Sequence, residues 1–142
     1  MSVARIRAAF ESRLAQWAAA RVPALPVVWT NASVSLPAVD HLRAYLLPAE
    51  TGSRDLAGKN RSYRGVFQVT VFTKAGIGPN RAEGIARELD ELFPVALRML
   101  NAGLGVQVLT PMAARPAIVE TDWYSVPVDC RYGAEEVQEV LS

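Results

Sequence analysis

The sequence has few of the residues from which most catalytic and metal sites are built. Its 142 residues include one histidine, His41, and one cysteine, Cys130. A single cysteine makes no internal disulfide, so nothing here indicates an oxidising compartment. A structural zinc site needs four nitrogen or sulfur ligands. The composition therefore excludes a disulfide scaffold and a structural zinc domain.

A surplus of charge of one sign is also missing. Fifteen Lys and Arg residues balance fourteen Asp and Glu residues, for a formal charge of +1. Phosphate contacts supply most nucleic-acid affinity, so the balance disfavours nonspecific nucleic-acid binding and leaves open one basic patch. Only Lys59 and Lys74 are lysines, and the remaining thirteen cations are arginines. Arginine is enriched at protein interfaces, although a GC-rich genome produces the same bias.

Long apolar runs are absent as well. No stretch approaches the roughly 20 apolar residues of a membrane span, and Arg5, Arg7 and Glu11 interrupt the N-terminal segment where a signal peptide would need its apolar run. We expect a protein that is soluble and intracellular at synthesis. With 51% hydrophobic residues, the chain has enough apolar side chains for one core, so residues 1–142 are predicted to form a single domain.

Two segments have helical periodicity. In the first, apolar residues fall within roughly an 80° arc, and in the second within roughly a 100° arc. The first stripe is Val3, Ile6, Phe10, Leu14 and Trp17, and the second is Ala82, Ile85, Leu89, Leu92 and Phe93. Asn80 and Glu83 resemble a capping box at the second helix. Residues 95–100 fit either a continued helix or an apolar loop.

Five segments have strand character, and they set the predicted fold class. They are residues 27–29, 40–48, 62–74, 106–109 and 123–132. The resulting order is α-β-β-β-α-β-β. Short turns between consecutive strands favour antiparallel pairing, and two helices on one face would make an α+β two-layer sandwich. Pro127 cannot donate to a ladder, so the last strand is expected at an edge or with a bulge.

The most polar stretch, residues 49–61, is predicted to be a long mobile hairpin loop. Arg54, Lys59 and Arg61, with Arg64 just beyond, leave a local positive surplus. Long loops are often functional, so these four cations are the candidate partner or lumen contacts, the alternative being a floppy hairpin tip. Residues 133–142 are acidic and read as a short helix or a tail.

Catalytic motifs are scarce. A nucleophilic enzyme would need Cys130 or a serine beside His41 with an orienting third group, and no Gly-x-Ser-x-Gly occurs. A surface histidine and a core cysteine are the simpler interpretation. Residues 76–80 precede a helix but match neither the Walker nor the dinucleotide pattern, so they are read as a turn. The sequence predicts no enzyme, no cofactor and no metal.

Glu120 and Asp122 are the one carboxylate pair that merits consideration as a metal site. Metal-dependent nucleases use such groups, and Asp129 lies further along the chain. Acidic residues between two strands more commonly mark a solvated hairpin turn, which is the favoured interpretation.

Four motifs together resemble the tail terminator proteins of long-tailed bacteriophages and prophages. They are Tyr63-Arg64-Gly65-Val66-Phe67-Gln68-Val69-Thr70-Val71, Gly76-Ile77-Gly78-Pro79-Asn80-Arg81-Ala82-Glu83, Leu92-Phe93-Pro94, and Asp122-Trp123-Tyr124-Ser125-Val126-Pro127-Val128. The resemblance runs from about Val3 to Tyr132. Residues 95–104 depart from it, being longer and more apolar than expected. The motifs are architectural, so no active-site residue is carried over.

The resemblance implies a virion structural protein. Members of that family assemble as rings, typically hexamers, on the end of the growing tail tube. They stop its polymerisation and offer a surface to the head–tail connector. The implied partners are other copies, the tail-tube protein and the connector, with DNA as passing cargo and no membrane. The implied location is the virion tail, after assembly in the bacterial cytoplasm.

Two alternatives remain open from the sequence. Another head–tail connector or tail-completion protein would share this composition. A small metal-dependent nuclease would require Glu120, Asp122 or Asp129 to converge in a cleft.

Overall fold

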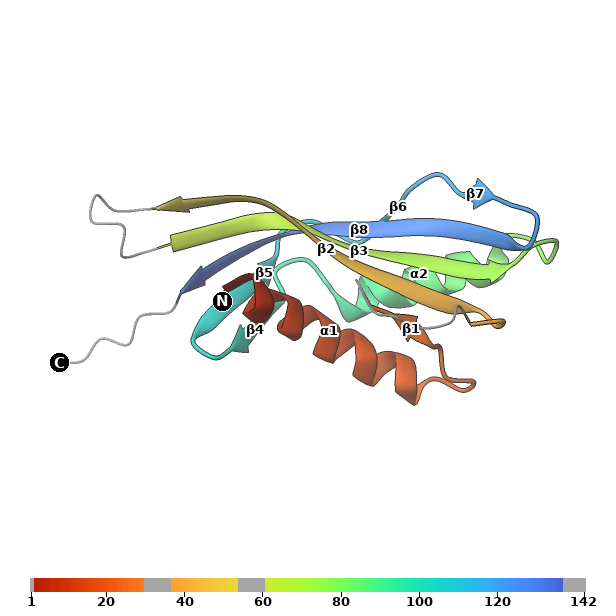
Figure 1. Ribbon diagram of the computed structural model, residues 1–142, viewed down its shortest axis with the longest axis horizontal. Helices are drawn as coiled ribbons and strands as arrows, with labels where there is room; N and C mark the ends of the chain where they lie inside the picture. The colour runs from red at the N-terminus through yellow and green to blue at the C-terminus, as the bar shows by residue number, and fades with distance from the viewer. Residues whose placement is uncertain (1, 30–36, 54–60, 137–142) are drawn as a thin grey trace.

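The computed structural model describes residues 2–29, 37–53 and 61–136, which form two helices and a curled mixed sheet (Figure 1). The helices are α1 (Ser2–Ala20) and α2 (Asn80–Leu92). The strands are β1 (Val27–Val28), β2 (His41–Ser53), β3 (Arg61–Lys74), β4 (Arg98–Asn101), β5 (Leu104–Val108), β6 (Ala113–Ala114), β7 (Ile118–Val119) and β8 (Trp123–Glu136). The predicted α+β class agrees with this content.

The sheet is organised around two long antiparallel strands. Its order is β1-β2-β3-β8-β5-β4, and β6 and β7 also pair with β8. Only β1 and β2 run parallel among the described pairs. The β3–β8 register runs without a shift from Ser62↔Glu135 to Lys74↔Trp123. The strand predicted over residues 62–74 therefore lies in the middle of the sheet.

One face of the sheet carries the core. Alternate residues of β3, namely Phe67, Val69 and Val71, are buried, and their partners on β2 and β8 continue the same apolar rows. Ile85 and Leu89 of α2 belong to the same buried cluster. Alternation along a strand places every second residue on one face. The apolar side chains of that face and of the helices therefore pack together in one core.

Phe10 of α1 lies at the centre of this core. Its ring stacks on that of Phe67 with centroids 4.3 Å apart. Phe93, just after α2, and Tyr132 of β8 each lie 5.6 Å from it. Tilted and edge-on aromatic pairs contribute beyond their area of burial. Four rings thus hold both helical segments against the two central strands.

Three short strands correct the predicted order. Residues 98–101 form β4 rather than a helix or an apolar loop, and they pair with β5 across the turn at Ala102 and Gly103. Both turn residues have positive φ, which an alternating-hydrophobicity pattern does not reveal. β6 and β7 lie in what reads as an irregular connection, where each pairs with β8 over only two residues. The two-layer arrangement stays a prediction.

The predicted bounds of two polar segments at one end of the sheet are wrong. Residues 49–53 belong to β2 and Arg61 to β3, because the ladder continues beyond Pro48 through a register shift between Pro48 and Glu50. Both ends of the predicted 49–61 loop are therefore strand, and residues 54–60 lie outside the described residues. Residues 133–136 extend β8 rather than starting a tail.

Pro127 lies in β8, which is a central strand without a bulge at this residue, so the expected edge exists only locally, on one side of the strand. It is opposite Thr70 of β3 in an unbroken register. Its carbonyl accepts the Arg115 N–H on the opposite side of β8. In an antiparallel strand a residue's N–H and C=O point to the same side, so the missing donor faces the interrupted edge between β6 and β7.

The start of α2 differs from the predicted capping box. Pro79 precedes the helix, and no side chain caps it. The Glu83 N–H donates to the Pro79 carbonyl, and Gly76 and Gly78 supply the positive φ angles of the preceding turn. The turn itself was predicted correctly, but Asn80 is the first helical residue and not the cap.

Gly65 provides a test of the close packing between β2, β3 and β8. A Cβ on Gly65 would lie 2.5 Å from the Tyr132 hydroxyl and 2.6 Å from the Leu47 carbonyl oxygen. We expect Gly65→Ala to lower the free energy of unfolding by about 1–3 kcal/mol, the usual cost of overpacking, measured by urea denaturation. The matched control is Gly84→Ala in α2, where nothing lies within 4 Å of the added Cβ and we expect stabilisation of about 1 kcal/mol. Equal effects of the two changes would contradict the packing argument.

Candidate functional site

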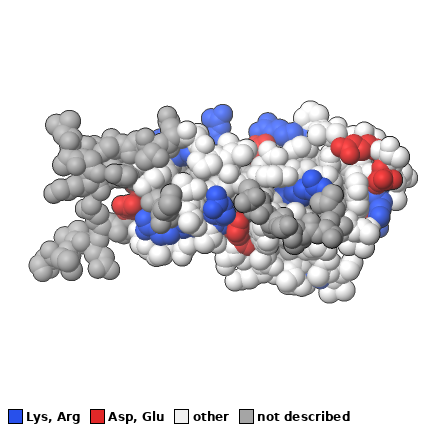
Figure 2. Space-filling view, viewed as in Figure 1, with Lys and Arg blue, Asp and Glu red and all other residues white. Residues whose placement is uncertain are grey.

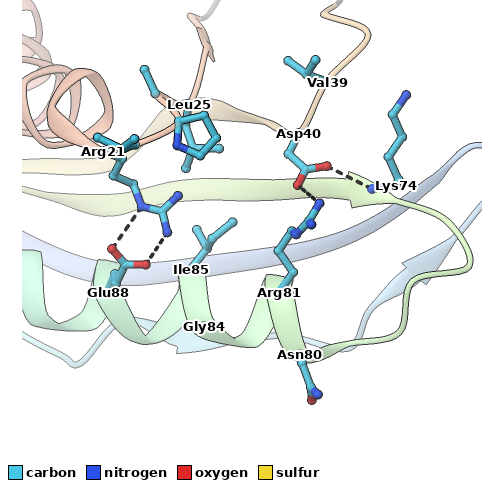
Figure 3. A pocket seen from close by; sticks show the side chains of 13 residues that line it. Arg21, Leu25, Val39, Asp40, Lys74, Asn80, Arg81, Gly84, Ile85 and Glu88 are labelled. Carbon is cyan, nitrogen blue, oxygen red and sulfur yellow. Dashed lines mark hydrogen bonds and ion pairs between the residues drawn. The ribbon is translucent and has the colours of Figure 1, made fainter.

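A hollow lies where α1 ends and α2 begins. Figure 2 shows cationic and anionic side chains interspersed along the visible face, with no single patch of one sign. The hollow is a cleft of about 780 Å³. Its walls are the connection after α1, the first two turns of α2, and the adjoining ends of β2 and β3 (Figure 3).

Two ion pairs stand at opposite sides of the cleft (Figure 3). The Arg21 guanidinium donates to both carboxylate oxygens of Glu88, at 3.0 and 2.6 Å. The Asp40 carboxylate accepts from Arg81 at 2.8 Å and from the backbone N–H of Lys74 at 3.2 Å. Two-point pairing fixes side-chain geometry, so both walls have defined shapes.

The lining between the ion pairs is mainly apolar. Leu25 and Ile85 are buried, whereas Val22 is 97% exposed and Val39 is 57% exposed. Gly84 faces the cleft from α2 (Figure 3), and a Cβ added there would meet nothing within 4 Å. Among the described residues that line the cleft there is no histidine, cysteine, serine, threonine or tyrosine. An apolar hollow with a few fixed charges is suited to binding.

This cleft was not predicted from the sequence. Its walls come from four separated segments, and each segment reads as an ordinary turn, helix or strand end. Gly84 is the one available signal, because glycine is a poor helix former and is unexpected within a helical pattern.

His41 lies on the face of the sheet opposite the main core. Its side chain is nevertheless only 1% exposed, which corrects the interpretation of a surface histidine. Its ring stacks on Phe72 at 4.8 Å and meets Trp123 edge-on. Arg43 lies over the same Phe72 ring, 4.4 Å from its centroid. Nε2 of His41 and Nε of Arg43 are buried without a hydrogen-bond partner.

The environment of His41 favours its neutral form. Burial lowers the pKa of His41 below its ordinary value, and the charges of Arg43 and Lys74 act in the same direction. The Val39 carbonyl, 2.9 Å from Nδ1, and the Asp40 carboxylate oppose this change in pKa. Among the described residues nothing would accept a hydrogen bond from Nε2 of the charged ring, so protonation gains no compensating interaction there.

Cys130 cannot pair with His41. It projects into the core beside Phe67, whereas His41 lies in the row of Phe72 and Ser125. Cys130 and Ser125 are an odd number of positions apart on β8, so the cysteine and the histidine occupy opposite faces. Burial raises the pKa of the Cys130 thiol to about 12, which leaves it protonated at neutral pH. The predicted core cysteine is confirmed.

The four predicted contact cations are only partly placed. Arg54 and Lys59 lie outside the described residues, and for Arg61 only the backbone, at the start of β3, is described. Arg64 is exposed on β3 and borders a small hollow of about 260 Å³ with Arg98 and Glu135. Their role as contacts stays a prediction.

The carboxylates Glu120, Asp122 and Asp129 do not converge. Glu120 and Asp122 are exposed at the turn before β8. Asp129 lies seven residues further along the extended strand, roughly 20 Å away, where Arg115 donates to both of its oxygens at 2.8 and 2.7 Å. Within the described ranges, no three His, Cys, Asp or Glu side chains are grouped to hold a metal ion. No described helix combines the length and hydrophobicity needed to cross a bilayer.

One protein-family model matches most of the chain. The model of the phage tail terminator protein family matches residues 5–132, which run from Arg5 in the first turn of α1, through α2, to Tyr132 of β8. The chain belongs to the phage tail terminator family. This membership confirms the resemblance noted from the four sequence motifs.

Similarity to a solved structure extends over the full length of the terminator. The two chains are 48% identical, with a TM-score of 0.81, and the match covers 100% of this chain and 99% of the other. No curated protein matches the chain. Family membership gives the terminator a structural role in phage tail assembly, as a component of the virion tail.

The buried thiol gives the first test of this description. We expect Cys130 of the native protein to react only slowly with dithiobis(nitrobenzoate) at pH 8, because the reactive thiolate is scarce when the pKa is about 12. The same protein in guanidinium chloride should release one equivalent of thionitrobenzoate. Rapid reaction of the native protein would contradict the placement of Cys130 in the core.

The buried histidine gives the second. Because the pKa of His41 is lowered in the folded state, the unfolded chain takes up a proton first as the pH falls below about 6.5. The stability that neutral His41 contributes is therefore complete above that pH and is lost as the pH falls towards the folded-state pKa.

We expect the free energy of unfolding of the wild type to fall between pH 7.5 and 5 relative to that of His41→Phe, which keeps an aromatic ring against Phe72. The pKa of Glu11 is raised by burial, but Glu11 is present in both proteins and cancels in the difference. Parallel pH profiles from urea denaturation would contradict the prediction.

Proposed function

We propose that this terminator caps the phage tail tube as a ring, stops its polymerisation and offers the surface to which the head is joined. The observation that carries the proposal is the family match over residues 5–132. The ring is proposed to be a hexamer, built in the host cytoplasm before it joins the virion tail. It acts without catalysis, and DNA passes it only as cargo.

The sheet supports ring formation by its exposed ends. β4 lies at one end of the sheet, and its Leu100 is 76% exposed. The other end carries β1, a strand of two residues. Open edges invite pairing with another chain, and head-to-tail contacts between identical copies close into a ring when their rotation closes.

The cationic hairpin is proposed to face the tube or the lumen. Arg54, Lys59, Arg61 and Arg64 would there meet acidic residues of the tube protein or the passing DNA. The exposure of Arg64 on β3 supports this assignment.

Ring formation and capping can be measured separately. Light scattering across a concentration series should show a shift from one subunit to a closed small ring, visible by negative-stain microscopy. Added to polymerising tail-tube protein, the terminator should arrest tube growth. A terminator that neither forms rings nor arrests tubes would contradict the proposal, and binding to a connector without tube arrest would favour another head–tail joining protein.

The hairpin assignment has its own test. Replacing residues 54–60 by an Asn-Gly turn, which suits a two-residue hairpin, should abolish tube arrest while the ring mass stays unchanged. Arg64→Glu should weaken arrest about tenfold or more, whereas Arg87→Glu on the exposed side of α2 should leave it unaltered. Full arrest by the shortened hairpin would overturn the assignment.

A further inference from the structure

The cleft beside α2 is shaped to receive another polypeptide segment. Glycine is among the poorest residues in a helix interior, yet Gly84 stands in the middle of α2, and no described residue lies within 4 Å of the Cβ that it lacks. What its missing side chain preserves is space in the cleft (Figure 3). Because packing among the described residues does not require this glycine, we take it as a place where another polypeptide segment can approach the backbone of α2 closely.

The chemistry of the cleft defines its occupant. The exposed Val22 and Val39 at the rim favour apolar side chains. In the Arg81–Asp40 pair, the arginine side chain is 58% exposed and the aspartate only 16%, and the exposed Lys74 lies beside them. The accessible charge on that side is therefore positive. A short apolar segment with an acidic residue fits both features.

The chain itself contains such a segment. Residues 137–142 read Val-Gln-Glu-Val-Leu-Ser, with Glu139 followed directly by Val140 and Leu141. They follow Glu136, the last residue of β8.

The same chain's cleft is out of reach for this segment. Arg5 pairs with Glu136 near the start of α1, whereas Arg21 lines the cleft beyond its end. Ala20 lies fifteen positions after Arg5 along the helix, which is a rise of roughly 22 Å. The four residues from Glu136 to Val140 reach at most about 14 Å. Figure 1 likewise places the end of β8 and the start of α2 at opposite ends of the molecule.

We propose that the cleft binds residues 137–142 of a second copy of this chain, with Val140 and Leu141 over Gly84 and Glu139 beside Lys74 and Arg81. The contact is head-to-tail, since donor segment and acceptor cleft lie on different parts of the surface. Such contacts are the kind that close into rings, so the inference rests on the proposed ring and names one of its contacts.

A peptide tests the acceptor cleft directly. Fluorescently labelled Glu136–Ser142, as the amide, is titrated into the chain shortened after Glu136, with anisotropy as the readout. We expect saturable binding that is at least tenfold weaker for a peptide carrying aspartate in place of Leu141. Absence of binding, or equal binding of the two peptides, would overturn the proposal.

Filling the cleft is the complementary test. Gly84→Leu adds a side chain where the fold has room and improves the helix, so the variant should fold, as circular dichroism would verify. It should bind the peptide at least tenfold more weakly. Arg87→Leu adds the same side chain to the same helix outside the cleft and should bind as the wild type does. Unchanged binding by Gly84→Leu would overturn the proposal.

Mixing the variants shows whether the contact joins two copies. The shortened chain and Gly84→Leu should each associate at least tenfold more weakly than the wild type by light scattering. Mixed together, one supplies the cleft and the other the segment, so pairwise association should return. Rings that form equally well from the shortened chain would overturn this inference and leave the proposed function standing. If the protein binds the peptide but neither forms rings nor arrests tubes, the proposed function is overturned and the assignment of the cleft as a peptide site stands.

Discussion

The stack of Phe10 on Phe67 is the interaction on which the other parts of the structure depend. It joins the first helix to the central strand, and Phe93 and Tyr132 close around it from the end of α2 and from β8. The position of α1 against the sheet follows from this contact. Arg21, one turn beyond the buried Ala18, then comes within reach of Glu88 on α2. The cleft is therefore a by-product of how the core is packed.

Much of the fold could be predicted because periodicity reports burial. The helical stripe containing Phe10 and the apolar character of residues 62–74 both follow from burial, and the helix and the strand predicted from them are present. The failures share a different cause. β4 depends on positive φ at Ala102 and Gly103, and β6 and β7 depend on the edge that β8 offers. Pro127 was misplaced because the sequence does not show which side of a strand lacks a partner.

The site was harder to predict than the fold because its parts are distant in sequence. The turn at Val22, the start of β2 at Asp40 and the middle of α2 at Gly84 meet only after the core has formed. Charged residues of a polar loop attract notice in a sequence, whereas a cleft between elements leaves almost no local pattern. For His41, alternation gave the correct strand but not the burial, because its cover is the aromatic ring of Trp123, far along the chain.

The position of β8 has a consequence for the order of events during synthesis. It is the last described strand in sequence, yet it pairs with β3, β5, β6 and β7. Until it emerges from the ribosome, β3 has one bare edge and the short strands have no sheet to join. Contacts between such distant segments form slowly, and incomplete chains with open edges are prone to aggregate. The growing chain would thus meet its greatest risk of misassembly before β8 has been synthesised.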